Sequence, residues 1–149
     1  MAEGVFLEMV AKRGWQDRFH IDSAGTARYH IGELPDPRAR ETMKRHGVNL
    51  TSRSRQFVPA DFEQFDYILG MDESNYANIL NVEGGGQHAD KVWMMRAFDD
   101  PMPTQHKSDK VVPDPYYGGD DGFEKAYQLL VNTHNHLLDY IARQEGWQD

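Results

Sequence analysis

An aspartate between two prolines is the residue of this sequence best suited to acid chemistry. Asp114 lies in the segment VVPDPYYGG, residues 111–119. Because a proline ring fixes its own backbone torsion, the flanking prolines restrain the direction in which the carboxylate points. An acid held in this way can protonate a leaving group, and Tyr116 and Tyr117 can wall a slot for an aromatic substrate. The competing interpretation is that Asp-Pro followed by Gly-Gly is merely a turn.

A second candidate segment, IDSAGT at residues 21–26, contains Ser23 and is followed by Tyr29. A loop that leaves the carboxyl end of a parallel strand lies where α/β folds bind their ligands. Tyr29 is therefore expected to line the mouth of a pocket. The alternative is that it is a surface tyrosine on a loop.

A third segment, FDYILGMDESN at residues 65–75, begins with an apolar run, and Asp72 follows that run directly. The expected strand delivers Asp72 to the same edge of the sheet as the other candidates. Asp72 is suited to cap the helix that follows it. The functional alternative is a hydrogen-bond acceptor that orders the neighbouring loops.

Composition excludes several classes of protein. The chain contains no cysteine, which rules out disulfides, thiolate zinc sites and a cysteine nucleophile within these 149 residues. The seven histidines show no metal-ligand spacing, so we expect no metal and no cofactor. A net charge of -8 argues against nucleic-acid binding, and the basic residues of segment 38–55 are most simply a solvated helix face and loop. A mean hydropathy of -0.75, with no long apolar run, predicts a soluble protein without a membrane span, and the absence of cysteine fits a cytoplasmic location.

Periodicity, caps and turns predict helices that alternate with strands. The expected helices are residues 2–13, residues 36–46, residues 72–80 and a long C-terminal helix with an apolar stripe from Phe123 to Ile141. The expected strands are Phe19–Ser23, Phe65–Met71 and Lys91–Met95. This alternation predicts one α/β domain, residues 1–149, with a three-layer, doubly wound parallel sheet. Such sheets usually open on a strand, whereas this chain opens on a helix, so a first strand is expected to be missing.

Several of these stretches together resemble the low-molecular-weight protein tyrosine phosphatase family. The matching stretches are AEGVF at 2–6, IDSAGT at 21–26, PDPRA at 35–39, Arg55-Gln56, DFEQFDYILGMDESN at 61–75 and VPDPYYGGDDGFEKAYQLL at 112–130. Arsenate reductases share the fold, but the paired tyrosines after Asp-Pro look more like the tyrosine phosphatase branch. The resemblance covers essentially the whole chain and implies a phosphotyrosine phosphatase I-like fold.

The resemblance also implies roles for individual residues. In that family a cysteine thiolate in a C-x5-R-S-P loop attacks phosphorus, and an aspartic acid protonates the leaving phenolate and then activates water. Asp114 matches that acid. Tyr29, Tyr116 and Tyr117 match the positions that frame the substrate ring. Ser23 and Asp72 are expected to hold neighbouring parts of the site in place without contacting the substrate. The implied substrate is a phosphotyrosine protein or a small aryl phosphate.

The sequence departs from the family pattern at its N-terminus. Met1 aligns between the family's Ser-Pro and Ala-Glu, so we expect the first central strand, the nucleophile and the phosphate-binding arginine to be absent. The chain as it stands is then expected to be inactive, and its sheet to contain a gap that promotes repacking or self-association. Three interpretations stay open: an enzyme whose catalytic loop lies upstream, a non-catalytic pseudophosphatase that binds a partner, and a fragment complemented in trans.

Overall fold

The structure, a computed structural model, describes residues 1–25, 37–50, 55–113 and 120–147. Its elements follow one another as α1 (Ala2–Lys12), η1 (Gln16–Arg18), α2 (Pro37–Arg45), α3 (Asp61–Gln64), β1 (Ile68–Gly70), α4 (Glu73–Leu80), η2 (Ala89–Lys91), β2 (Val92–Met94), η3 (Met95–Asp99) and α5 (Asp120–Glu145). The predicted alternation of helices and strands is therefore present. Both strands are shorter than predicted, at three residues each.

The strands β1 and β2 pair in parallel, with Leu69 opposite Trp93 at the centre of the register. Leu69 and Trp93 point toward one set of helices, since they pack in a cluster with Leu137 of α5. Their neighbours Ile68 and Val92 point the other way. This alternation across a pleated sheet requires an apolar cover on both faces.

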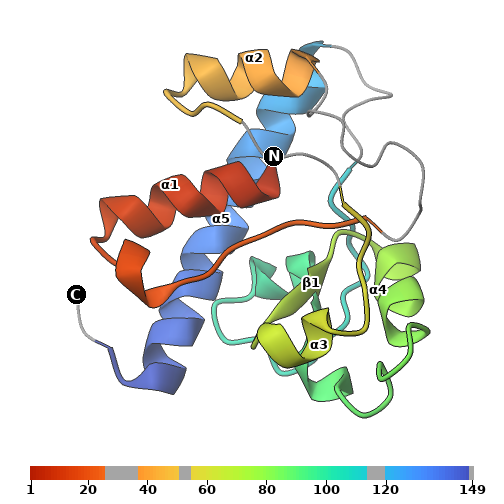
Figure 1. Cartoon of the computed structure of the whole chain (residues 1–149). Helices are drawn as coiled ribbons and strands as arrows, with labels where there is room; N and C mark the ends of the chain where they lie inside the picture. The colour runs from red at the N-terminus through yellow and green to blue at the C-terminus, as the bar shows by residue number, and fades with distance from the viewer. Residues whose placement is uncertain (26–36, 51–54, 114–119, 148–149) are drawn as a thin grey trace.

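Helices supply that cover on the two sides of the sheet. Phe62 of α3 and Ile79 of α4 pack on one face, whereas α1 and α5 pack on the other. Figure 1 shows α4 on one side of β1 and the crossing pair α1 and α5 on the opposite side. The fold is therefore α/β, with a parallel sheet between two helical layers, as the sequence predicts.

The long helix α5 forms the centre of the apolar core. Its predicted apolar stripe is confirmed, because the side chains of Leu137 and Leu138 are fully buried and Leu130 is 2% exposed. The stripe packs against α1, whose predicted end is also confirmed. Gly14 adopts a φ of +73° directly after that helix, a conformation that costs a residue with a Cβ about 1–2 kcal/mol.

The predicted strand Phe19–Ser23 is wrong. Residues 19–24 run as extended chain without pairing to another strand, and the segment makes only a single parallel bridge, between Gly25 and Gln56. The alternating pattern of its side chains predicted the extended backbone correctly. A strand also needs a neighbouring chain at hydrogen-bonding distance, which the pattern does not reveal. Within the described residues the sheet therefore has two strands, where three were expected.

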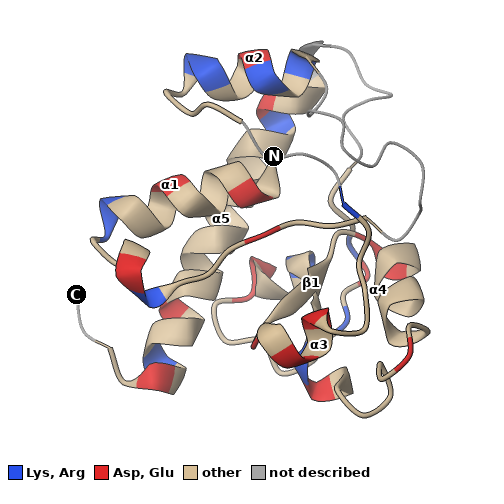
Figure 2. Cartoon of the chain, viewed as in Figure 1, with Lys and Arg blue, Asp and Glu red and all other residues tan. Residues whose placement is uncertain are grey.

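Charged residues are distributed over all the elements, with a basic concentration on α2 (Figure 2). Lys44 and Arg45 in the last turn of that helix are exposed, which agrees with the interpretation of segment 38–55 as a solvated helix face. In the described part of the chain, no helix is long and apolar enough to cross a membrane.

Candidate active site

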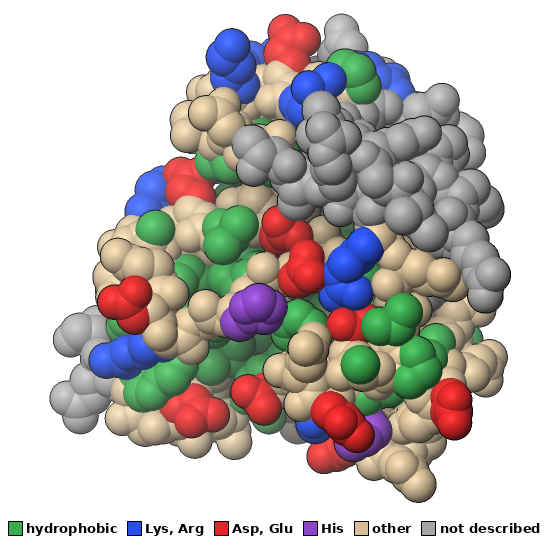
Figure 3. Space-filling model, in the orientation of Figure 1, with side chains coloured by type: hydrophobic (Ala, Val, Ile, Leu, Met, Phe, Trp, Pro, Cys, Tyr) green, Lys and Arg blue, Asp and Glu red, His purple; other side chains and the backbone are tan. Residues whose placement is uncertain are grey.

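A cavity of about 670 Å³ lies between residues 21–25 and the strand β1. Residues 67–71 form its other long wall, and α1 and α5 contribute side chains that include Phe6, Leu130 and His134. Protein interiors contain few voids larger than a water molecule, and binding pockets typically measure about 300–1,000 Å³. A void of this size in the sheet layer is therefore a binding-site candidate. Acidic, basic and apolar side chains adjoin one another on the face shown in Figure 3.

Asp72 lies at the carboxyl end of β1, on the wall of this cavity. Its Oδ1 accepts a hydrogen bond from the backbone N–H of Asn75 at 2.7 Å, so it is the N-cap of α4. The capping role predicted from the sequence is therefore confirmed. Because the same carboxylate fixes the first turn of α4 beside the cavity, it also orders the wall to which it belongs.

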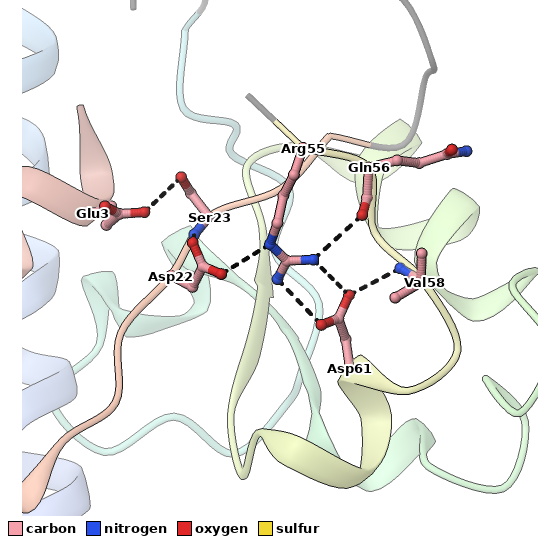
Figure 4. A network of polar contacts seen from close by, with 7 residues as sticks. All are labelled: Glu3, Asp22, Ser23, Arg55, Gln56, Val58 and Asp61. Atoms are coloured by element: carbon pink, nitrogen blue, oxygen red, sulfur yellow. Dashed lines mark hydrogen bonds and ion pairs between the residues drawn. The ribbon is translucent and has the colours of Figure 1, made fainter. Parts of the chain in front are cut away.

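Ser23 lies on the opposite wall and is tied to α1. Its hydroxyl donates a hydrogen bond to Glu3 Oε1 at 2.8 Å, and its backbone N–H donates to Asp22 Oδ1 at 2.8 Å. The bond to Glu3 holds the extended segment against the first turn of α1 (Figure 4). Ser23 is exposed, and its hydroxyl links this wall of the cavity to Glu3 of α1.

Arg55 connects Asp22 on this rim to Asp61, the first residue of α3. Its Nε donates to Asp22 Oδ2 at 2.8 Å, and its two terminal nitrogens donate to the two carboxylate oxygens of Asp61 at 3.0 and 3.1 Å. Asp61 also accepts a hydrogen bond from the backbone N–H of Val58 at 2.8 Å (Figure 4). The hydrogen bond to Asp61 is the largest influence that raises the pKa of Arg55. A bidentate pair of this kind fixes the relative position of both backbones.

The structure brings two of the predicted site residues together. Ser23 and Asp72 line the same cavity from opposite walls. The other four predicted site residues, Tyr29, Asp114, Tyr116 and Tyr117, lie outside the described residues. Gly25 and Pro113, the last described residues before these two segments, both line this cavity.

Two features of the site were not predicted from the sequence. The first is the pairing of Arg55 with Asp61, for which the signal was two opposite charges on either side of the apolar Phe57 and Val58. The second is His134, which was assigned to the apolar stripe of the last helix without a polar role. Its ring is 1% exposed, and neither ring nitrogen has a hydrogen-bond partner.

The environment of His134 keeps its imidazole neutral. Burial, and to a smaller degree the positive charge of the chain's amino group, lower the pKa of His134 to about 3. Met1 also lines the cavity, and burial lowers the pKa of its amino group as well. In the ranges that the structure describes, no three His, Asp or Glu side chains cluster closely enough to hold a metal ion.

A parallel sheet between two helical layers, with a cavity that runs beside β1 and includes Asp72 at the carboxyl end of that strand, defines an α/β protein with a candidate binding site at the strand end. The sequence matches the description "Low molecular weight phosphotyrosine protein phosphatase" over residues 1–146, and the chain belongs to this family.

Individual relatives agree with this assignment. The chain is 42% identical to the low molecular weight phosphotyrosine protein phosphatase of Schizosaccharomyces pombe, over 95% of this chain and 88% of that protein. It is 40% identical to a putative low molecular weight protein-tyrosine-phosphatase of Synechocystis, over 96% of this chain and 88% of the relative. The crystal structure of a protein tyrosine phosphatase from Entamoeba histolytica, with Hepes in its active site, superposes with a TM-score of 0.82 at 35% identity and covers 97% of this chain and 88% of that one.

Proposed function

We propose that this chain is the acid-bearing and substrate-framing portion of a low-molecular-weight protein tyrosine phosphatase, and that its nucleophile comes from polypeptide outside these 149 residues. The observation that carries the proposal is that the chain belongs to a phosphatase family over residues 1–146 and yet contains no cysteine. The candidate substrates are a phosphotyrosine protein and a small aryl phosphate. We place the activity in the cytoplasm and treat residues 1–149 as one domain.

In the complete enzyme the proposed reaction has two steps. The cysteine thiolate forms a bond to phosphorus, and the bond between phosphorus and the phenolic oxygen breaks as Asp114 gives its proton to that oxygen. Asp114 then takes a proton from water, which attacks phosphorus, releases inorganic phosphate and restores the thiolate. Tyr29, Tyr116 and Tyr117 frame the aromatic ring of the substrate. Ser23 and Asp72 order the two walls of the cavity.

The chain as printed is therefore expected to hydrolyse no p-nitrophenyl phosphate above background. General acid catalysis alone contributes about 10²–10⁴-fold, whereas enzymes accelerate reactions by about 10⁶-fold or more. The measurement is p-nitrophenol release by the purified protein, with and without vanadate. Reproducible turnover that vanadate inhibits would contradict the proposal.

The role of Asp114 is tested in a longer chain that carries a C-x5-R-S-P loop joined ahead of Met1. Asp114→Asn is expected to lower kcat for aryl phosphates by about 10²–10⁴-fold, since the leaving phenolate then departs without a proton. The matched control is Asp109→Asn, which changes a nearby exposed acid and should retain full activity. Equal rates for the Asp114 variant and the parent would remove Asp114 from its assigned role.

The second candidate function is a pseudophosphatase that binds a partner without catalysis, with which the absence of a cysteine from the chain is compatible. Calorimetric titration with a phosphotyrosine peptide separates the two functions. Stoichiometric binding by the chain as printed, lost in a Tyr116→Ala and Tyr117→Ala double variant, supports the binding module. No binding until the catalytic loop is supplied supports the enzyme.

A further inference from the structure

The long connection between β2 and α5 returns along the edge of β2 that faces away from β1. The backbone N–H of Met94 donates to the carbonyl of His106 at 2.7 Å, and Nδ1 of His106 lies 2.7 Å from the carbonyl oxygen of Val92. The His106 ring also stacks on Trp93, with the ring centroids 3.6 Å apart. The connection is therefore fastened to β2 before it reaches its last described residues.

One peptide unit of this connection is then tied to the carboxyl ends of both strands. The backbone N–H of Val112 donates at 2.8 Å to the carbonyl of Met71, which directly follows β1. The carbonyl of Val111 accepts a hydrogen bond at 3.1 Å from Nη1 of Arg96, which lies two residues after β2. This carbonyl and this N–H belong to the same planar peptide unit and point in opposite directions. Two anchors on opposite sides therefore fix the orientation of the unit.

Arg96 is itself oriented by Asp99 before it reaches Val111. Its Nε donates to Oδ2 of Asp99 at 3.0 Å, and its Nη2 lies 3.0 Å from the same oxygen. The side chains of Arg96 and Asp99 are 21% and 26% exposed, so water screens this pair only in part. Because the guanidinium is planar and its donors form a rigid fork, the bonds to Asp99 also set the direction of Nη1.

The anchored peptide unit lies next to the proposed acid in the sequence. Pro113 is the only residue between Val112 and Asp114, and its ring fixes its own φ at about -65°. Few free torsions therefore separate the anchored unit from Asp114. A general acid must lie within about 2.6–3.2 Å of the oxygen that it protonates, and a misplacement of about 1 Å can lower a rate by about 10²-fold.

We propose that Arg96 is a positioning residue for Asp114. Together with Asp99, it holds the peptide unit of Val111 and Val112 against the strand ends, so the segment that carries the acid starts from a fixed point. The inference rests on the proposed function, because it requires Asp114 to be the proton donor. The simpler alternative is an arginine that only stabilises an exposed loop.

The first measurement uses the chain as printed and follows hydrogen exchange by NMR. Arg96→Met removes the hydrogen bond to Val111, so exchange of the Val112 amide should become about tenfold faster, the equivalent of one hydrogen bond. The matched control is Arg143→Met, which removes an arginine contact to another backbone carbonyl, that of Pro101 at 2.7 Å, and should not affect Val112. Unchanged exchange of Val112 in Arg96→Met would overturn the proposal.

The second measurement separates positioning from stability, in the longer chain that carries the C-x5-R-S-P loop. Phenyl phosphate releases a more basic phenolate than p-nitrophenyl phosphate does, so its cleavage depends more on the proton of the acid. Arg96→Met should therefore lower kcat/KM for phenyl phosphate by about 10–10²-fold and for p-nitrophenyl phosphate by less. Arg96→Lys, which retains a donor for Val111, should recover part of this loss, and Arg143→Met should show none. Equal losses for the two substrates mean that Arg96 only stabilises the loop, and overturn the proposal.

Asp114→Asn distinguishes failure of this inference from failure of the proposed function. It should show the same selectivity, with the larger loss for phenyl phosphate. If it does so and Arg96→Met does not, the proposed function stands and Arg96 is not a positioning residue. If the longer chain is inactive, or if Asp114→Asn cleaves both substrates at the rates of the parent, the proposed function fails and the role of Arg96 fails with it.

Discussion

Arg55 holds together two segments that are far apart in the sequence, and its two ion pairs differ in burial. The side chain of Asp61 is 4% exposed, whereas that of Asp22 is 37% exposed. Solvent screens the exposed pair, so most of the stabilisation is expected to come from the buried one. Asp61 also accepts from the backbone of Val58, so its carboxylate serves three donors from two residues.

Asp61→Asn is therefore expected to lower the free energy of unfolding by about 1–3 kcal/mol, because it leaves a buried set of donors only partly satisfied. Asp22→Asn is the matched control and should cost less than about 1 kcal/mol. Urea unfolding followed by tryptophan fluorescence measures both variants. Equal losses for the two variants would show that burial does not separate these ion pairs.

The helices could be predicted from the sequence because their ends are set by local chemistry. Asp72 before α4 and the glycines after α1 and α2 act within a few residues of the chain. The prediction of a strand at Phe19–Ser23 failed, because a strand depends on a partner that is distant in sequence. Its alternating side chains are typical of a half-buried strand, and the pattern carries no information on whether a neighbour is present.

Asp72→Ala tests the start of α4 at the scale of the element. Loss of the N-cap hydrogen bond to Asn75 should lower the free energy of unfolding by about 1 kcal/mol. Asp72→Ser, which retains an oxygen acceptor, should recover most of that loss. The measurement is the denaturation midpoint of each variant. If Ala and Ser behave alike, the carboxylate stabilises the cavity wall by some means other than the cap.

The candidate site could be predicted from the sequence only where its residues come in recognisable segments. Ser23 and Asp72 were found because parallel strands deliver their ends to one edge, and both line the cavity. A gap in the sheet is predicted from the sequence, but the side chains that line the cavity could not be, since they depend on the way residues 19–25 and β1 lie apart across the layer. His134 lies in the apolar stripe of the last helix, so its sequence position did not indicate that its buried ring would lack hydrogen-bond partners.

The stability of the whole molecule should depend on pH through His134. Its pKa is about 3 in the folded chain and about 6.5 in the unfolded chain, so between these values the unfolded state binds more protons. Stability attributable to this group is therefore fully present above pH 6.5 and falls by about 1.4 kcal/mol per pH unit as the pH decreases toward 3. His134→Leu removes this dependence and also removes an unpartnered buried group, so it should stabilise the chain at every pH.

The measurement is the difference in the free energy of unfolding between His134→Leu and the parent, obtained by urea titration at several pH values from 7.5 to 4.5. Subtraction cancels the other carboxylates and histidines, which titrate in both proteins. The difference should widen steadily as the pH falls. A difference that is constant with pH would mean that the ring of His134 reaches water or a partner, and that the cavity beside it does not isolate it.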